Sequence, residues 1–108
     1  MIIRTNPADA PRVNAAVDGR IMFREERLEA ILLTLAAGET MQPHQNPFDV
    51  LFVGVEGKAR LITGESEMEI RPGYSIFVSA DEHRGWENTG KTPCRVMVVK
   101  ILQGKSPS

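Results

Sequence analysis

The sequence predicts an all-β protein, an antiparallel barrel or sandwich built from short strands. Apolar or alternating runs recur at close, regular spacing between residues 20 and 102, and turn-forming residues such as glycine, proline and asparagine separate them. The chain has 108 residues, which is near the usual size of one domain. We therefore predict a single domain that spans residues 1–108.

The two ends of the chain differ in composition from the rest. Residues 1–18 carry Pro7 and Pro11 among small and polar residues, which predicts an extended arm that lies on the barrel or on a partner. A turn at Asp18 and Gly19 leads into a strand at residues 20–23. Residues 103–108 are polar and are predicted to be a disordered tail.

Residues 28–37 (LEAILLTLAA) present a conflict between helix and strand. The run is rich in good helix formers and is followed by Gly38, where a helix would end, so local propensity favours a helix. A continuous apolar run also suits a strand that is buried on both faces, and tertiary context overrides propensity. We predict a strand.

The remainder of the chain has the patterns of strands and tight turns. The segment between Gly38 and Val50 is taken as a loop, and the strands on either side of Glu56 and Gly57 are expected to form a hairpin. Pro72 and Gly73 suit the centre of a type II turn. The predicted strands are residues 50–55, 58–63, 66–70, 74–78, 84–87 and 94–102.

Residues 38–57 (GETMQPHQNPFDVLFVGVEG) resemble the first motif of the cupins, small β-barrels in which histidines and a glutamate hold a metal. That motif is a glycine, five residues, His, one residue, His, three or four residues, Glu, six residues and Gly. Gly38, His44 and Gly57 fit the pattern, whereas Asn46 stands at the second histidine and Val50 at the glutamate. The resemblance implies a double-stranded β-helix, or jelly-roll barrel, with most of its metal ligands replaced.

Residues 73–90 (GYSIFVSADEHRGWENTG) resemble the second cupin motif. Gly73 and Asn88 have the family's separation, but a strict count puts Arg84 at the histidine position, with His83 one residue early. Neighbouring residues on a strand point to opposite faces, so His83 faces away from the barrel interior unless a bulge near Gly85 turns it back.

The two histidines are the candidate metal ligands. We expect His44 and His83 to approach each other across the barrel interior, where they and Asn46 can hold a weakly bound divalent ion such as Zn, Ni, Fe or Mn. The alternative is that both histidines are ordinary pocket-lining or loop groups. Asp49 is expected to be a solvated charge, because it lies on the opposite face of the strand from Val50.

A second group of residues suits a ligand without a metal. Arg84 and Trp86 are two residues apart, so both can share one face and offer a cation and a stacking surface to an anionic or polar ligand. The alternative is core packing for Trp86 and a surface ion pair for Arg84. Gln42 and Phe52 are further candidates from alternation alone. No catalytic triad, phosphate loop or pair of catalytic carboxylates is visible in the sequence.

Composition narrows the partners and the location. The formal net charge of −1 offers no basic surface for nucleic acid or anionic lipid, and no apolar run is long enough for a membrane helix. A single cysteine and the absence of a signal-peptide pattern suggest a cytoplasmic protein. The apolar strands at residues 28–35 and 94–102 exceed what one small interior needs, which, with the cupin resemblance, predicts a homodimer.

Two functions fit these observations best. The first is a small-molecule-binding barrel with a pocket around His44 and His83. The alternative is a metal-dependent cupin enzyme, such as an oxygenase, isomerase, decarboxylase or lyase acting on a small polar metabolite. A purely structural role as a dimeric interaction module is a third reading, and the fold alone does not decide among them.

Overall fold

Residues 1–102, which the computed structural model describes, form nine strands and no helix; the predicted tail at residues 103–108 lies outside this part. None of these residues belongs to a helix that is long and apolar enough to cross a membrane. The strands are β1 (Asp18–Arg24), β2 (Leu28–Leu35), β3 (Thr40–His44), β4 (Asp49–Glu56), β5 (Ala59–Thr63), β6 (Glu67–Ile70), β7 (Ser75–Val78), β8 (Arg84–Glu87) and β9 (Cys94–Ile101).

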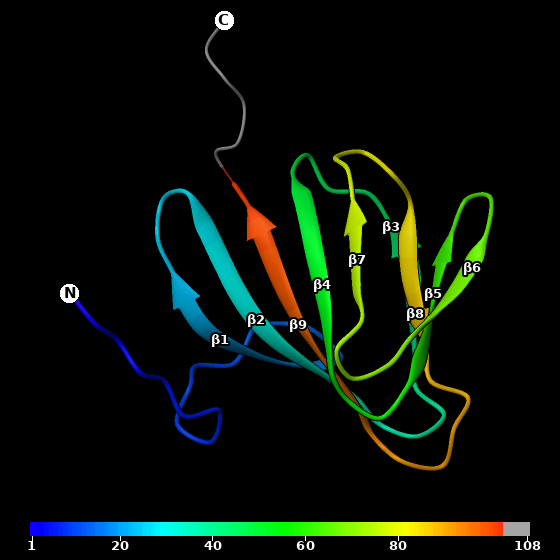
Figure 1. Cartoon of the computed structure of the whole chain (residues 1–108), viewed down its shortest axis with the longest axis horizontal. Coiled ribbons are helices and arrows are strands. Elements are labelled where there is room, and N and C mark those ends of the chain that lie inside the picture. Colours follow the sequence, from blue (N-terminus) through cyan, green and yellow to red (C-terminus); the bar gives the residue numbers. More distant parts are fainter. Residues whose placement is uncertain (103–108) are drawn as a thin grey trace, which may run out of the picture.

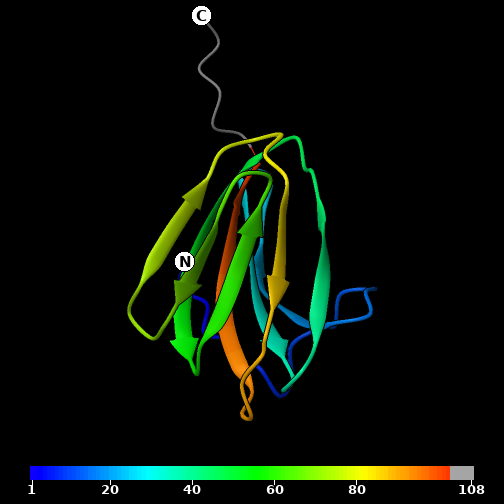
Figure 2. The same ribbon diagram turned by 90° about the vertical axis from the view of Figure 1, so that its right-hand side faces the viewer.

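The strands make two antiparallel sheets that face each other (Figure 1). The five-stranded sheet has the order β1-β2-β9-β4-β7, and the four-stranded sheet has the order β3-β8-β5-β6. Figure 2, turned by 90°, brings the four-stranded sheet toward the viewer, with β2 and β9 of the larger sheet behind it. The architecture is the predicted all-β jelly roll.

β2 and β9 form the centre of the larger sheet and are paired along their whole length. The prediction of a strand at residues 28–37 is therefore confirmed, although β2 ends at Leu35. Ile31 and Leu33 are buried on its inner face, and Leu32 on its outer face is only 5% exposed. An apolar run that is covered on both sides gains more from sheet packing than its helix propensity could provide.

The predicted hairpin between residues 50–55 and 58–63 is wrong. β4 pairs with β7 and β9 in one sheet, whereas β5 pairs with β6 and β8 in the other. Gly57 has a φ of 65°, and a Cβ at this position would lie 2.3 Å from the carbonyl oxygen of Pro93. The turn residues were identified correctly, but they make a corner between the sheets, packed against the loop before β9.

The segment that was predicted as a loop before residue 50 contains a further strand, β3. It forms an edge of the smaller sheet, and its pairing with β8 shifts register between Met41 and His44. Pro43 lies in this interval, where its missing N–H costs no regular ladder hydrogen bond. Proline and polar residues conceal such an edge strand from pattern-based prediction.

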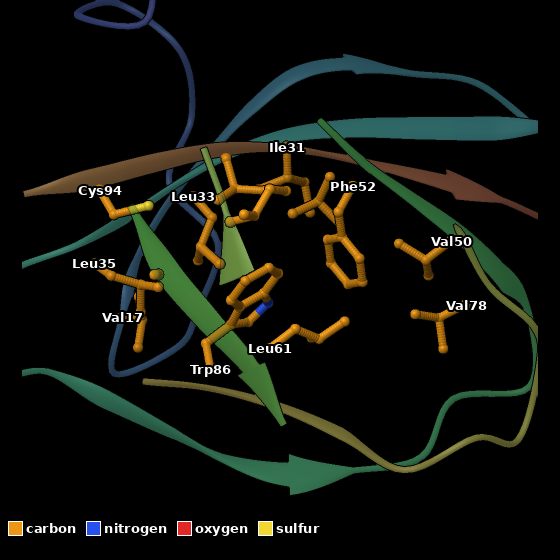
Figure 3. Packing of buried hydrophobic residues seen from close by; sticks show 14 residues of the cluster. Val17, Ile31, Leu33, Leu35, Val50, Phe52, Leu61, Val78, Trp86 and Cys94 are labelled. Atoms are coloured by element: carbon orange, nitrogen blue, oxygen red, sulfur yellow. The ribbon is translucent and has the colours of Figure 1, made fainter. Parts of the chain in front are cut away.

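The core lies between the inner faces of the two sheets (Figure 3). Phe52 of β4 and Trp86 of β8 meet across it edge to face, with ring centroids 5.1 Å apart. Burying each large apolar side chain contributes roughly 1.5–3 kcal/mol to stability. The apolar side chains with no exposed surface are Leu35, Val50, Leu61, Ile70 and Val96.

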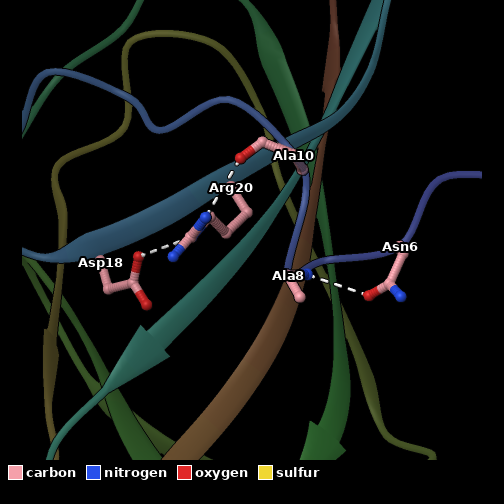
Figure 4. A network of polar contacts seen from close by, with 5 residues as sticks. All are labelled: Asn6, Ala8, Ala10, Asp18 and Arg20. Atoms are coloured by element: carbon pink, nitrogen blue, oxygen red, sulfur yellow. Dashed lines mark hydrogen bonds and ion pairs between the residues drawn. The ribbon is translucent and has the colours of Figure 1, made fainter.

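The N-terminal arm lies on the barrel. The backbone N–H of Val13 donates to the carbonyl of Gly19 at 2.9 Å. Arg20 donates from Nη1 to the carbonyl of Ala10 at 3.1 Å and forms an ion pair with Asp18 at 3.3 Å (Figure 4). These contacts attach the arm to β1, which begins at Asp18 and not at residue 20.

An apolar row crosses the outer face of the five-stranded sheet. Strand register places its members side by side, one from each strand. In sheet order they are Phe23, Ala30, Val99, Leu51 and Phe77. Phe77 is 57% exposed and the other four are partly exposed. A continuous apolar row on a sheet face is typical of an interface between copies of a chain.

Homodimerisation through this face therefore remains our prediction. Light scattering after size exclusion should give twice the mass of one chain at micromolar concentration. Val99→Glu, at the centre of the row, should give monomers because it buries a charge in the interface. The control Met68→Glu changes an exposed apolar residue of the other sheet and should stay dimeric. A monomeric native chain would contradict the prediction.

Candidate functional site

A cavity of about 270 Å³ lies between the two sheets, next to the N-terminal arm. Both sheets, the arm and the segment after β3 contribute to its walls. The lining residues are Val13, Asn14, Ala15 and Val17 of the arm, Ile31 and Leu33 of β2, Met41 and His44 of β3, Asn46, Phe52 of β4, Arg84 and Trp86 of β8, and Val98 and Lys100 of β9.

Most of the cavity wall is apolar. Alternation along β2 and β9 turns Ile31, Leu33 and Val98 inward, and Figure 3 shows the first two near Phe52 and Trp86. The indole N–H of Trp86 donates no hydrogen bond to any of residues 1–102. Among these residues, every side-chain polar atom that is fully buried has a hydrogen-bond partner. The N–H therefore keeps some accessible surface and is a spare donor.

The arm closes one side of the cavity. Its close approach to β1 depends on Gly19, because a Cβ at that position would lie 2.6 Å from Cγ2 of Val13. Val17 is 5% exposed and belongs to the core, so this end of the arm is held by packing as well as by backbone hydrogen bonds.

The polar side chains of the cavity are Asn14 of the arm, His44, Asn46, Arg84 and Lys100. His44 and Arg84 are direct neighbours across the β3–β8 pair, and His44 Nδ1 lies 3.2 Å from the carbonyl oxygen of Gln42. With its amide oriented to satisfy its neighbours, Asn46 accepts a hydrogen bond at 2.6 Å from Nη2 of Arg84. The cavity therefore combines an apolar body with a small polar, cationic region.

Arg84 is the most unusual of these groups, because it is only 3% exposed and none of residues 1–102 supplies a carboxylate within ion-pair distance. Its other hydrogen bond is a long one, 3.5 Å from Nη1 to the carbonyl oxygen of Glu82. Burial lowers the pKa of the Arg84 guanidinium from its usual value, because the charged form loses its hydration.

Lys100 is the second cation of this region. Its Nζ lies 3.4 Å from Oε1 of Glu29, which also pairs with Arg24. The Phe48 ring lies near both cationic side chains, with its centroid 5.4 Å from Nζ of Lys100 and 5.9 Å from Cζ of Arg84. One carboxylate thus serves two surrounding cations, while Arg84 has an aromatic face and neutral acceptors only.

The register of β8 explains why Arg84 faces the cavity. Arg84 pairs with His44 and Trp86 pairs with Met41, and all four of these residues line the cavity. Gly85 lies between them, where a Cβ would be 2.5 Å from the carbonyl oxygen of Met41. The glycine accommodates the irregular backbone of β3. It does not turn His83 inward, which was the role considered for it.

The two histidines do not approach each other, contrary to our expectation. His83 is exposed and lines a different and larger hollow of about 540 Å³, near β6 and β7, whereas His44 lines the cavity. The residue count along the second motif was correct, and strand alternation separates the adjacent residues His83 and Arg84. Gln42 is exposed and lies outside the cavity, because the register shift in β3 gives the places opposite Trp86 and Arg84 to Met41 and to His44, which lines the cavity although it too is exposed.

The structure brings together five of the candidates: His44, Asn46, Phe52, Arg84 and Trp86. Sequence reasoning missed the contribution of the arm, and it also missed Lys100. The signal for Lys100 was present, since it follows Cys94, Val96 and Val98 in the inward alternation of β9. A charge at the inward position of an apolar strand indicates a special environment. The arm residues carried no comparable signal.

The donors in the cavity do not fit a metal ion. No group of three or more His, Cys, Asp or Glu side chains among residues 1–102 is arranged to hold one. His44 is the only imidazole in the cavity, the Asn46 oxygen is directed at Arg84, and Val50 is buried in the core. A guanidinium at the ligand position repels a cation, so we assign no metal to this cavity.

Comparison with known proteins places this architecture in a family. Residues 31–100 match the family described as the cupin domain, and because the match spans well over half of the chain, this protein belongs to the cupin family. Among curated proteins, no sequence matches that of this chain significantly.

Solved structures support the same fold. The polyketide cyclase RemF from Streptomyces resistomycificus has a TM-score of 0.83 at 18% identity, over 95% of this chain and 81% of that one. KdgF from Halomonas sp. has a TM-score of 0.81 at 16% identity, over 95% and 96%. A predicted oxalate decarboxylase from Thermotoga maritima has a TM-score of 0.80 at 16% identity, over 94% and 100%. At these identities the likeness shows the fold alone.

Gly85→Ala should destabilise the protein by about 1–3 kcal/mol, because the added methyl collides with the backbone of β3. The matched control is Gly64→Ala, since a Cβ at Gly64 meets nothing within 4 Å. Urea unfolding of both variants measures the difference. Equal stabilities would show that β3 does not approach β8 as described.

Protein produced without a histidine tag should carry zinc, nickel, iron and manganese at far below one ion per chain, because one imidazole and one amide make a poor site. Elemental analysis after dialysis tests this. A stoichiometric ion that is lost in His44→Ala and retained in the control His83→Ala would contradict the assignment.

Proposed function

We propose that this chain is a small-molecule-binding cupin and that its binding site is the cavity between the sheets. The observation that supports this proposal most directly is the composition of the cavity wall. Apolar side chains from both sheets surround most of it, and Asn14, His44, Asn46, Arg84 and Lys100 supply its polar groups. Ligand sites in proteins combine a mostly apolar enclosure with a few placed polar groups in this way.

The size of the cavity supports the same proposal. A volume of about 270 Å³ is close to the lower end of the range, about 300–1,000 Å³, that small-molecule sites occupy. The cavity is also open to solvent, so a ligand can enter it. A cavity of this size beside a buried cation is therefore better explained by a ligand than by packing.

The hollow that contains His83 is larger but is a weaker candidate. Most of its lining residues, among them Glu65, Ser66, Phe77 and Asp81, are exposed, and their polar groups remain hydrated. Binding strength depends on groups that are desolvated and pre-positioned, so its greater volume does not make it the stronger site.

Metal-dependent catalysis, the alternative function, has less support. Among the structural neighbours are a named polyketide cyclase and a predicted oxalate decarboxylase, but fold likeness does not transfer an activity. The cavity of this chain presents a guanidinium and an amide where the family pattern has histidines. Binding without metal chemistry requires no residue that the cavity lacks.

The test is whether filling the cavity abolishes binding. Cyclohexanecarboxylate and its neutral amide are suitable probes, since both are small and absorb little where the sole tryptophan, Trp86, is excited. At least one of them should bind and change Trp86 emission. Val98→Phe should weaken binding by tenfold or more because its ring occupies the cavity.

The matched control is Val55→Phe, which adds the same ring at a position that is 48% exposed and outside the cavity. It should bind both probes as the native chain does. If Val98→Phe binds as tightly as this control, the probes occupy some other site and the proposal fails.

A further inference from the structure

The cavity contains a positive charge whose counter-ion is not supplied by the described chain. Arg84 is 3% exposed, and all six ion pairs within residues 1–102 involve other side chains. Burying a guanidinium is costly unless the charge is paired and its donors are satisfied. An isolated buried cation of this kind indicates that an anion completes the site.

Arg84 also has unused hydrogen-bond donors. A guanidinium carries five N–H groups in a planar fork. Two are accounted for, one by Asn46 at 2.6 Å and one by the carbonyl oxygen of Glu82 at 3.5 Å. No hydrogen bond within residues 1–102 uses Nε. The remaining donors lie at a residue that lines the cavity, where a ligand can accept from them.

The surroundings strengthen the preference for a negative group. Lys100 also lines the cavity, and Glu29, the carboxylate that pairs with it among residues 1–102, is shared with Arg24. Phe48 presents its ring to both Lys100 and Arg84, and a ring face attracts cations without neutralising them. Lys100 and Arg24 therefore share one carboxylate, and Arg84 adds a third positive charge that has none within ion-pair distance among residues 1–102.

The rest of the cavity restricts the remainder of the ligand. Its walls beyond the cationic region are formed by apolar side chains such as Leu33, Phe52, Trp86 and Val98. A strongly hydrated, multiply charged ligand would leave polar groups unpaired against these walls. A compact ligand with one charged end and one apolar body matches both parts of the cavity.

We infer that the natural ligand is a small monocarboxylic acid with an apolar body, bound with its carboxylate on the guanidinium of Arg84 and its body between the sheets. The assignment rests on the proposed function, because it concerns the same cavity. The planar fork of arginine matches a carboxylate with two parallel hydrogen bonds, and Lys100 adds a second positive charge.

The experiment compares cyclohexanecarboxylate with cyclohexanecarboxamide, which has the same shape and no charge. Calorimetry on the native chain should show the carboxylate binding at least about tenfold more tightly, because hydrogen bonds to a charged group are the stronger ones. In Arg84→Met the two affinities should come within about threefold of each other. The methionine replaces a buried cation by an apolar group of similar length, which cores tolerate well.

Two further variants keep the result interpretable. Arg95→Met removes one positive charge from an exposed position on the outer face of β9 and should preserve the carboxylate preference. Arg84→Lys keeps the charge but loses the planar fork and should give an intermediate preference. If Arg84→Met does not fold, the comparison of Arg84→Lys with Arg95→Met tests whether the carboxylate preference depends on Arg84. A preference that falls in Arg84→Lys and not in Arg95→Met supports the assignment.

Each outcome is decisive. Equal binding of acid and amide by the native chain would overturn the carboxylate assignment and leave the proposed function standing. Binding of neither probe would overturn both. Tighter binding of cyclohexylphosphonate than of the carboxylate would also overturn the assignment, in favour of a dianionic ligand. If Arg95→Met lowers the carboxylate preference as much as Arg84→Met does, the preference reflects the overall charge of the protein and not a site at Arg84.

Discussion

The burial of Arg84 inside the barrel is the constraint on which the rest of the site depends. Two-residue alternation along β8 turns this guanidinium inward together with Trp86, and the surrounding structure adjusts to its charge. Asn46 directs an oxygen at it and Phe48 places a ring beside it. Each contact offsets part of the lost hydration, but neither neutralises the charge. In a family whose pattern places metal ligands here, we propose that this cation makes the cavity a site for anions instead of metals.

Two glycines allow the segments that wall the cavity to pack closely. Gly85 allows the irregular edge strand β3 to lie against β8, and Gly19 allows the N-terminal arm to pack on β1. Without the first, the strand that carries His44 would move away from the cavity. Without the second, the arm would no longer close it. The arm thus contributes to the site as well as to the fold, although its sequence predicts only an extended N-terminal segment.

Much of the fold could be predicted from the sequence, because short apolar runs and turn residues are local signals. The strand at residues 28–37 required the further argument that burial on both faces outweighs propensity. The corner at Gly57 was mistaken for a hairpin, since a turn pair does not say whether its strands share a sheet. Edge strand β3 was missed because Pro43 and a register shift interrupt the alternation of apolar and polar residues that identifies a strand.

The candidate site was only half visible in the sequence, for a physical reason. Counting along the second motif identified Arg84, but whether it or His83 faced inward depended on the pairing of β8 with β3, which is a tertiary property. Lys100 lies far from both motifs and reaches the cavity only because β9 occupies the centre of the larger sheet. The residues that line the cavity come from five strands, the N-terminal arm and the segment after β3, and local patterns do not show which segments meet.

The most direct measurement is a crystal structure of the native chain soaked with cyclohexanecarboxylate. The account predicts density for the probe in the cavity, with both carboxylate oxygens about 2.7–2.9 Å from nitrogens of the Arg84 guanidinium and the ring against Phe52 and Trp86. A probe bound with its carboxylate directed away from Arg84, or a cavity that stays empty at saturating concentration, would contradict the claim that Arg84 makes this cavity an anion-binding site.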